Sequence, residues 1–214
     1  MKNFNYYTPT EIVFGNDSES KIGYLVRRYE GTKVLIHYGG KSAERSGLLS
    51  DICRQLDAEG ILYVKLGGVV PNPRLSKVYE GIELCRTEGV NHILAIGGGS
   101  VIDSAKAIAY GLAYDGDVWD LFDGKAEAKA CYPIGVVLTI PAAGSEMSNG
   151  CVITNEVGSR KRAYNNDLAR PKFAIMNPER TFSLSTYQTA CGIVDIMMHT
   201  MEQFSSSNAK LSIR

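Results

Sequence analysis

Several features that would place a protein in a special class are missing from this sequence of 214 residues. No apolar run approaches the roughly 18–20 residues that a membrane-spanning helix needs, and the opening residues contain no signal-peptide core. Lys+Arg and Asp+Glu both number 23, so there is neither a basic excess for nucleic acid nor an acidic arm. The five cysteines form no CxxC pair, which argues against a disulfide framework or a zinc knuckle. We therefore expect a cytoplasmic protein with no nucleic-acid partner and no membrane partner.

Short apolar strands alternate with amphipathic helices through the first two thirds of the chain. Strands are expected at 33–39, 61–69, 91–99 and 132–141. Helices are expected at 46–60, 71–89 and 100–114, followed by a polar loop at 115–129. This order predicts an α/β fold, with a Rossmann-like parallel sheet covered by helices on both faces. Farther along, the pattern predicts a hairpin at 151–167, a strand at 172–179 and a helix at 185–204.

Glycine is concentrated where one of these strands meets its helix, in the sequence HILAIGGGSVIDSAKAIAYG (92–111). Gly97, Gly98 and Gly99 permit close backbone approach or a positive φ, and Ser100 stands where the helix begins. The free N–H groups at a helix N-terminus favour an anion such as a phosphate. The loop matches neither GxGxxG nor a Walker motif, so by itself it also fits a tight turn without a ligand.

Loop-forming residues also follow the other strands of the predicted sheet, at 37–42, 71–73 and 139–146. The carboxyl ends of parallel strands meet at one edge, where α/β sheets place their ligands. Four such loops at one edge would suit an extended ligand such as a dinucleotide.

A second group of chemically capable residues lies in the predicted helix at 185–204. Asp195 and His199 are four residues apart and therefore share one face, as two ligands of a divalent metal could. A surface pair or a buried hydrogen bond would give the same spacing. Cys191 is a possible third ligand or a small core residue, and Glu202 is spaced to partner His199. Apolar neighbours predict that this helix is largely buried; they are Ile193, Val194, Ile196, Met197 and Met198.

Taken together, these stretches resemble the iron-containing alcohol dehydrogenases, and in particular their butanol-dehydrogenase branch. The resemblance rests on GGGSxxDxxK and GxxDxxxHxxE, with PNPRLSKVYEG, TIPAAGSEMSNGCVITN and FAIMNPE between and around them. It implies a dinucleotide-binding α/β domain at 1–184, and at 185–214 the start of an all-helical metal-binding domain. It also implies an NAD or NADP cofactor, and Fe²⁺ or Zn²⁺ as the metal.

The resemblance assigns roles to individual residues. It places the pyrophosphate on Gly98, Gly99 and Ser100, and the two metal ligands at Asp195 and His199. The remaining residues that it implies for the cofactor are Asn72, Thr139, Ala142, Ser145, Lys161, Thr181 and Leu184. Asn72 would lie near the adenosine half, Lys161 would reach a ribose, and Thr181 and Leu184 would lie near the adenine or its ribose.

The residues after the first predicted strand bear on the choice between NAD and NADP. Members of the family that prefer NAD tend to place an Asp there, which binds the ribose 2′-hydroxyl. This sequence has Gly39, Gly40, Lys41 and Ser42 instead. A lysine and a hydroxyl could bind a 2′-phosphate, so NADP is the favoured cofactor.

The family supplies two further metal-binding histidines, whereas His199 is the last histidine of this sequence. We therefore expect a fragment or truncated chain that binds metal weakly and has little activity alone. The complete enzyme would interconvert a small primary alcohol and its aldehyde, as a homodimer. Two alternatives are a glycerol-dehydrogenase-like or dehydroquinate-synthase-like enzyme and a non-catalytic dinucleotide-binding module.

Overall fold

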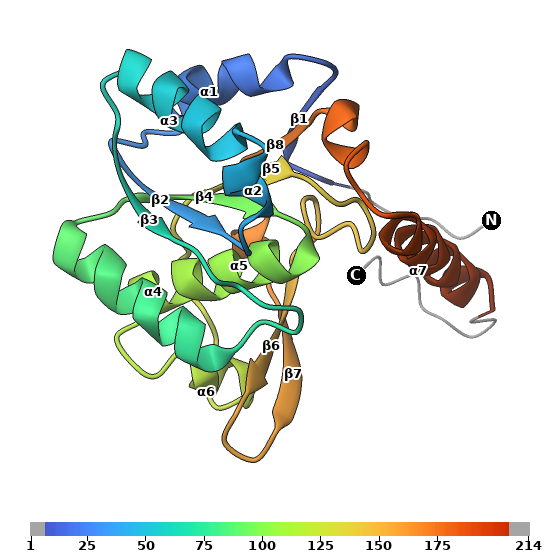
Figure 1. The fold of residues 1–214 in the computed structure, drawn as a ribbon. Coiled ribbons are helices and arrows are strands. Elements are labelled where there is room, and N and C mark those ends of the chain that lie inside the picture. Colours follow the sequence, from blue (N-terminus) through green and yellow to red (C-terminus); the bar gives the residue numbers. More distant parts are fainter. Residues whose placement is uncertain (1–6, 206–214) are drawn as a thin grey trace.

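The computed structural model describes residues 7–205, and at its centre lies one parallel sheet (Figure 1). Its strands are β1 (Glu11–Phe14), β2 (Lys33–Tyr38), β3 (Leu62–Leu66), β4 (His92–Gly97), β5 (Ile134–Leu138) and β8 (Phe173–Met176). They pair in the order β1-β8-β5-β4-β2-β3, and every pairing is parallel. The predicted Rossmann-like α/β fold is therefore confirmed.

Helices cover both faces of the sheet, and each face has its own apolar core. On one face lie α1 (Ile22–Arg28) and α3 (Leu48–Ala58), and on the other lie α4 (Leu75–Glu88) and α5 (Gly99–Ala113) (Figure 1). A short helix, α2 (Ser42–Arg45), precedes α3. Because β4 is covered on both faces, all of its residues are buried, which explains its continuous apolar sequence.

Some elements differ from the sequence prediction. The strand β1, the 3₁₀ turn η1 (Ser18–Lys21) and α1 are missed, because β1 is a short edge strand with a half-exposed side-chain pattern. The predicted loop at 115–129 is wrong at its centre, where α6 (Trp119–Phe122) forms a helical turn. Trp119 and Phe122 are buried, Arg160 lies 5.4 Å from the Trp119 ring and Tyr164 lies 5.9 Å from Phe122, so packing against β7 holds this turn.

The predicted hairpin is confirmed. It consists of β6 (Gly150–Asn155) and β7 (Arg160–Asn165), which pair antiparallel and project beyond α5 (Figure 1). Gly158 in the turn has a φ of 76°, a left-handed conformation that glycine adopts without strain. Two 3₁₀ turns, η2 (Asp167–Ala169) and η3 (Pro178–Thr181), stand before and after β8.

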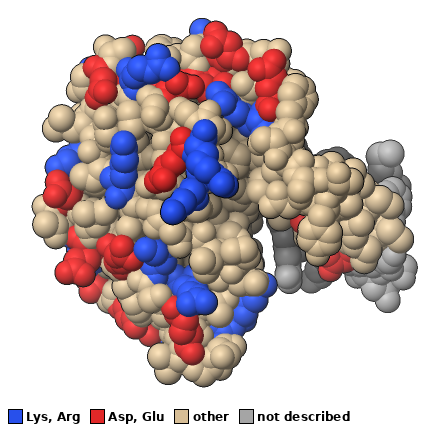
Figure 2. Space-filling view, in the orientation of Figure 1, with Lys and Arg blue, Asp and Glu red and all other residues tan. Residues whose placement is uncertain are grey.

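The last described helix, α7 (Thr186–Ser205), stands out from the layers of the sheet domain (Figure 1). The expectation that it is largely buried is wrong for this structure, since Ile193 is 53% and Met198 is 56% exposed. No element within residues 7–202 covers its apolar side chains, and the helix shows no Lys or Arg (Figure 2). Among the described residues, no helix is both long enough and apolar enough to cross a membrane.

Candidate functional site

A pocket of about 310 Å³ opens at the carboxyl edge of the sheet, between the loops that follow β3, β4 and β5 and the β6–β7 hairpin. The predicted cofactor residues that line it are Asn72, Gly99, Ser100, Ala142, Ser145 and Lys161. The rest of its wall comes from Pro73, Asp103, Ile140, Ala143 and Val152. Residues from distant parts of the sequence thus converge where parallel sheets place their ligands.

The N-terminus of α5 forms one wall of the pocket. Within the described chain, no side chain caps this helix, so its first N–H groups remain available beside Gly99 and Ser100. A Cβ on Gly98 would stand 3.3 Å from the Cβ of Ile140, a tight contact, so glycine eases the approach of these two loops. None of the three loop glycines has a positive φ. Close approach accounts for Gly97, whose Cβ would stand 2.6 Å from Val101 Cγ2, but not for Gly99, which has room for a side chain. An uncapped helix N-terminus at a pocket suits a phosphate group.

The mouth of the pocket is formed by two segments that hydrogen bonds hold together. Lys161 Nζ on β7 donates to Asn72 Oδ1 at 2.7 Å, and Thr154 N on β6 donates to Pro73 O at 2.8 Å. Asn72 has a φ of 56°, a left-handed conformation that asparagine tolerates better than most residues. The Lys161 ammonium therefore lies beside the pocket, where it can meet an anionic or hydroxyl-bearing ligand.

Asp103 lines the pocket one turn into α5, and the sequence interpretation gave it no role. Its carboxylate accepts hydrogen bonds from Ser145 Oγ at 2.6 Å and from Val152 N at 3.0 Å. Burial raises the pKa of Asp103, and the hydrogen bond from Ser145 only partly opposes this effect. The signal in the sequence was its place three residues after Ser100, on the same side of the helix.

The other residues predicted for the cofactor do not line this pocket. They are Gly39, Gly40, Ser42, Gly98, Thr139, Thr181 and Leu184. Gly39 and Gly40 lie in the loop after β2, and Ser42 is the first residue of α2, all on the same edge of the sheet. Thr139 donates its backbone N–H to Gly97 O at 3.1 Å, beside the β4–α5 turn. Thr181 and Leu184 lie in the segment between η3 and α7.

The two predicted metal ligands lie together on α7. His199 Nε2 is 3.8 Å from Asp195 Oδ1, and both side chains are about half exposed. The helix approaches the pocket at Gly192, where a Cβ would stand only 2.9 Å from Pro141 O. No group of three or more potential metal ligands occurs within the described residues. Donor type and spacing thus fit a divalent metal, but the described set is smaller than a usual catalytic site.

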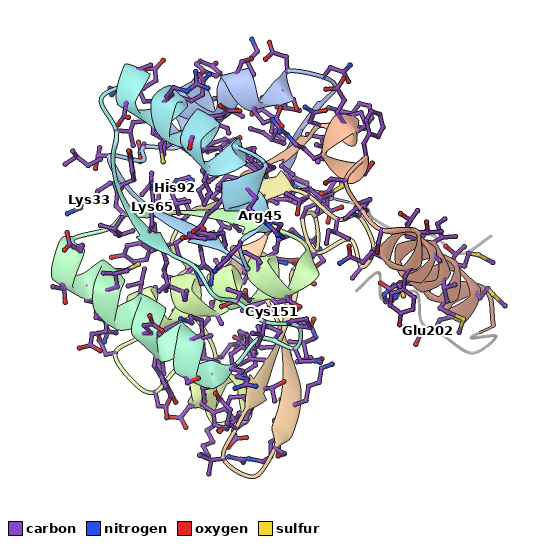
Figure 3. All side chains as sticks on the ribbon, viewed as in Figure 1. Lys33, Arg45, Lys65, His92, Cys151 and Glu202 are labelled. Carbon is purple, nitrogen blue, oxygen red and sulfur yellow. The ribbon has the colours of Figure 1, made fainter. Side chains whose placement is uncertain are left out.

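One neighbour of this pair, Cys191, differs from expectation. Cys191 is exposed, so its interpretation as a core residue is wrong for this structure. Glu202, which the spacing allows as a partner of His199, is exposed farther along α7 (Figure 3). Most side chains of α7 are exposed here, and the helix comes close to the loop after β5 at Gly192.

Comparison with known proteins places this geometry in context. Residues 9–178 match a family model described as "Iron-containing alcohol dehydrogenase". A probable NADH-dependent butanol dehydrogenase of Bacillus subtilis is 45% identical over 95% of this chain and 52% of its own length. An NADPH-dependent aldehyde reductase of Escherichia coli is 38% identical over 95% of this chain and 52% of its own.

A solved structure is similar to this chain in both fold and sequence. The crystal structure of NADH-dependent butanol dehydrogenase A from Thermotoga maritima has a TM-score of 0.92 and 43% identity, over 94% of this chain and 51% of that one. The chain therefore spans about half the length of the relatives that it matches.

Proposed function

This chain belongs to the iron-containing alcohol dehydrogenase family, and from that premise we propose that it binds a nicotinamide dinucleotide at the carboxyl edge of its sheet. The whole protein would interconvert a small primary alcohol and the corresponding aldehyde. The observation that supports binding most directly is the pocket between the uncapped N-terminus of α5 and the Asn72–Lys161 pair. Relatives named as NADH- or NADPH-dependent dehydrogenases and reductases are similar over nearly the whole chain.

Each part of the pocket has a role in this proposal. The N–H groups at Gly99 and Ser100 would hold the pyrophosphate, and Lys161 would reach a ribose hydroxyl. Asp103 and Ser145 would shape the deeper part of the pocket beside the ligand, because their side chains are hydrogen-bonded to one another there. The nicotinamide, when bound, supplies the hydride acceptor or donor.

We further propose Asp195 and His199 as two ligands of a divalent metal, Fe²⁺ or Zn²⁺. Their oxygen and nitrogen donors suit either ion, and Gly192 brings their helix against the loop that follows β5. Two described ligands are fewer than the three that catalytic zinc sites usually have, so this chain should hold the metal weakly. A divalent metal in such a site would polarise the substrate oxygen as a Lewis acid.

The binding and catalytic parts of the proposal can be tested separately. NADPH and NADH fluorescence titrations of the purified chain measure dinucleotide binding, and metal analysis after dialysis against Zn²⁺ or Fe²⁺ measures metal retention. Reduction of butyraldehyde by NADPH with either metal added measures turnover. We expect dinucleotide binding with little turnover, which also fits a dinucleotide-binding module. Rapid turnover would contradict the expected inactivity, and no dinucleotide binding would contradict the proposal itself.

We propose NADP rather than NAD as the preferred cofactor. Lys41, in the loop after β2, and Ser42, at the start of α2, are exposed. The nearby Glu44 accepts a hydrogen bond from the Tyr38 hydroxyl at 2.9 Å. Arg45 on α2 adds a second cation to this region (Figure 3). Lys41, Ser42 and Arg45 would favour a 2′-phosphate.

The Lys41→Gln variant should therefore bind NADPH about tenfold more weakly and NADH with unchanged affinity, because only NADPH carries the 2′-phosphate. Fluorescence titration with both cofactors measures this difference. The control is Lys172→Gln, which removes an exposed charge just before β8, at the opposite edge of the sheet. Equal losses for both cofactors in the Lys41 variant would contradict the preference.

A further inference from the structure

Lys106 is a fully buried lysine in the middle of α5. Its ammonium donates to three backbone carbonyls, those of Ser145 at 2.8 Å, Ser148 at 2.9 Å and Gly150 at 2.8 Å. The hydroxyl oxygens of Ser145 and Ser148 each lie 3.2 Å from the same nitrogen. Within residues 7–202, Lys106 makes no ion pair with a carboxylate. Its direct partners therefore all come from a single segment, 145–150, and the nearby Asp103 and Glu146 carboxylates also favour its charge.

The number of N–H donors on Lys106 equals the number of backbone carbonyls that the segment 145–150 presents to it. A lysine ammonium has three N–H donors and no acceptor, and three carbonyls take them all. A buried charge without such partners would be strongly unfavourable, so the backbone of 145–150 must turn its carbonyls towards α5. The Lys106 ammonium thus holds the backbone carbonyls of 145–150 against α5.

The segment that Lys106 holds belongs to the wall of the pocket. Ala142, Ala143 and Ser145 face Gly99 and Ser100 across it, and Ser145 is itself one of the residues bound by Lys106. The Asp103 carboxylate also holds this wall, at Ser145 Oγ and, two residues beyond the segment, at Val152 N. Because Ser100, Asp103 and Lys106 stand on one rigid helix, α5 determines both the phosphate wall and the distance to the opposite wall.

We propose that Lys106 is a positioning residue that fixes the width of the dinucleotide pocket by holding the 145–150 segment against α5. The proposal rests on the function proposed above, because it assigns Lys106 to that same pocket. Lys106 would not touch the ligand. Its loss would release the 142–150 wall, so that the contacts to the nicotinamide dinucleotide are made by a mobile segment.

The test compares Lys106→Met with wild type by two measurements on the 214-residue chain. Methionine fills similar space without any N–H donor, so the three carbonyls lose their partner. Hydrogen–deuterium exchange of peptides covering 139–152 reports the wall directly and needs no ligand. NADPH fluorescence titration reports the pocket. We expect at least about tenfold faster exchange in 139–152 and about tenfold weaker NADPH binding, because charged hydrogen bonds exceed neutral ones in strength.

A control separates positioning from a general loss of stability. Ile108→Ala truncates a core side chain of the same helix, which packs against α4 at Gly81 rather than against the 145–150 segment. It should lower the melting temperature without accelerating exchange selectively in 139–152. Unchanged exchange in Lys106→Met, or equal acceleration in Ile108→Ala, overturns the proposal.

Failure of the proposed function gives a different result. If wild type binds neither NADPH nor NADH, the function proposed above fails, while the exchange measurement still decides whether Lys106 holds the wall. If wild type binds and Lys106→Met binds equally well despite a loosened wall, the role in the pocket is refuted.

Discussion

Gly99 is the first residue of α5, and its environment is open enough to accept a side chain. A Cβ there would stand 4.0 Å from the Cβ of Ala143, an ordinary contact, and the backbone φ is not in the left-handed region. A substitution at this position therefore changes the charge at the pocket more than it changes the fold.

The Gly99→Asp variant should bind the nicotinamide dinucleotide at least about tenfold more weakly, because a carboxylate would occupy the helix N-terminus and repel the pyrophosphate. Its free energy of unfolding should be unchanged or higher by about 0.3–1 kcal/mol, because an anion at a helix N-terminus is favourable. Fluorescence titration and urea denaturation measure the two effects. Gly99→Asn, of the same shape without the charge, should lose much less affinity.

Burial determines the charge of two histidines in the sheet, His37 and His92. His37 Nδ1 lies 3.0 Å from Leu66 O and Nε2 lies 2.9 Å from Ser104 Oγ, so Nδ1 donates to the carbonyl and Nε2 accepts from the hydroxyl. The ring nitrogens of His92 make no ordinary hydrogen bond to the described residues. Burial lowers the pKa of each to about 4, so both are neutral at pH 7.

This shift predicts that acid destabilises the fold before carboxylates titrate. The unfolded chain takes up a proton on His92 near pH 6.5, whereas the folded chain resists until about pH 4, so stability is full above pH 6.5 and is lost as the pH falls below it. Between pH 7 and pH 5, the free energy of unfolding should therefore fall by about 2 kcal/mol less in His92→Leu than in wild type. Urea denaturation at both pH values measures this. An unchanged pH dependence in His92→Leu would mean that His92 is not the neutral group inferred here.

Among the elements, α7 is held differently from the others. Strands and helices of the sheet domain bury an apolar face, whereas α7 exposes Ile193, Met197 and Met198 and meets the sheet domain closely at Gly192. A glycine in the middle of a helix normally costs stability relative to alanine. Here it allows the helix to approach the backbone carbonyl of Pro141.

The Gly192→Ala variant should therefore show the reverse of the usual glycine-to-alanine effect. The new Cβ would meet Pro141 O at 2.9 Å, closer than real contacts, so α7 must move away from the pocket loop. We expect faster hydrogen exchange in peptides from 186–202 despite the higher helix propensity of alanine, by about threefold or more. Gln188→Ala, on an exposed position of the same helix, should leave exchange unchanged or slower. Slower exchange in Gly192→Ala would contradict the contact.

Some secondary-structure elements can be predicted from the sequence pattern and others cannot. β4 is predictable because burial on both faces leaves a continuous apolar run, and the hairpin is predictable from Gly158 between two β-rich runs. In contrast, β1 is a short edge strand and α6 is one turn held by the packing of Trp119 and Phe122. Neither has a period long enough to be detected. The pocket is only partly predictable. Its glycines mark a turn and Asp103 stands three residues after Ser100, but the partners of Asp103, Ser145 and Val152, are set by the tertiary structure.

At the scale of the whole molecule, one ion pair joins the beginning of the chain to the segment that leads into α7. Glu19 in η1 is buried, and it accepts hydrogen bonds from Asn177 Nδ2 at 2.9 Å and Arg180 Nε at 2.5 Å. Burial alone would raise the pKa of Glu19, but the hydrogen bonds from Arg180 and Asn177 outweigh it and lower the pKa. The pair therefore stabilises the molecule when Glu19 is ionised.

The Glu19→Gln variant should lower the free energy of unfolding by about 1–3 kcal/mol at pH 7, because Arg180 and Asn177 lose a charged acceptor. Since the folded pKa is depressed, this contribution is present above the unfolded value of 4.5 and is lost as the pH falls through the folded one. Urea denaturation should therefore show a smaller difference between variant and wild type at pH 3.5 than at pH 7. Glu59→Gln, which breaks the exposed pair with Arg27, should change stability by less than about 1 kcal/mol.

The sequence by itself determined the alternation of strands and helices, the parallel sheet and the loop of glycines before α5. These features follow from the local periodicity of apolar residues and from the conformational freedom of glycine. Only the tertiary structure decided that Asp103 meets Ser145, that Lys106 meets Ser148, and that Lys161 meets Asn72. Those partners lie 42, 42 and 89 residues apart. A hydrogen bond between such distant residues depends on how the whole sheet and hairpin pack, and no short stretch of sequence encodes that packing.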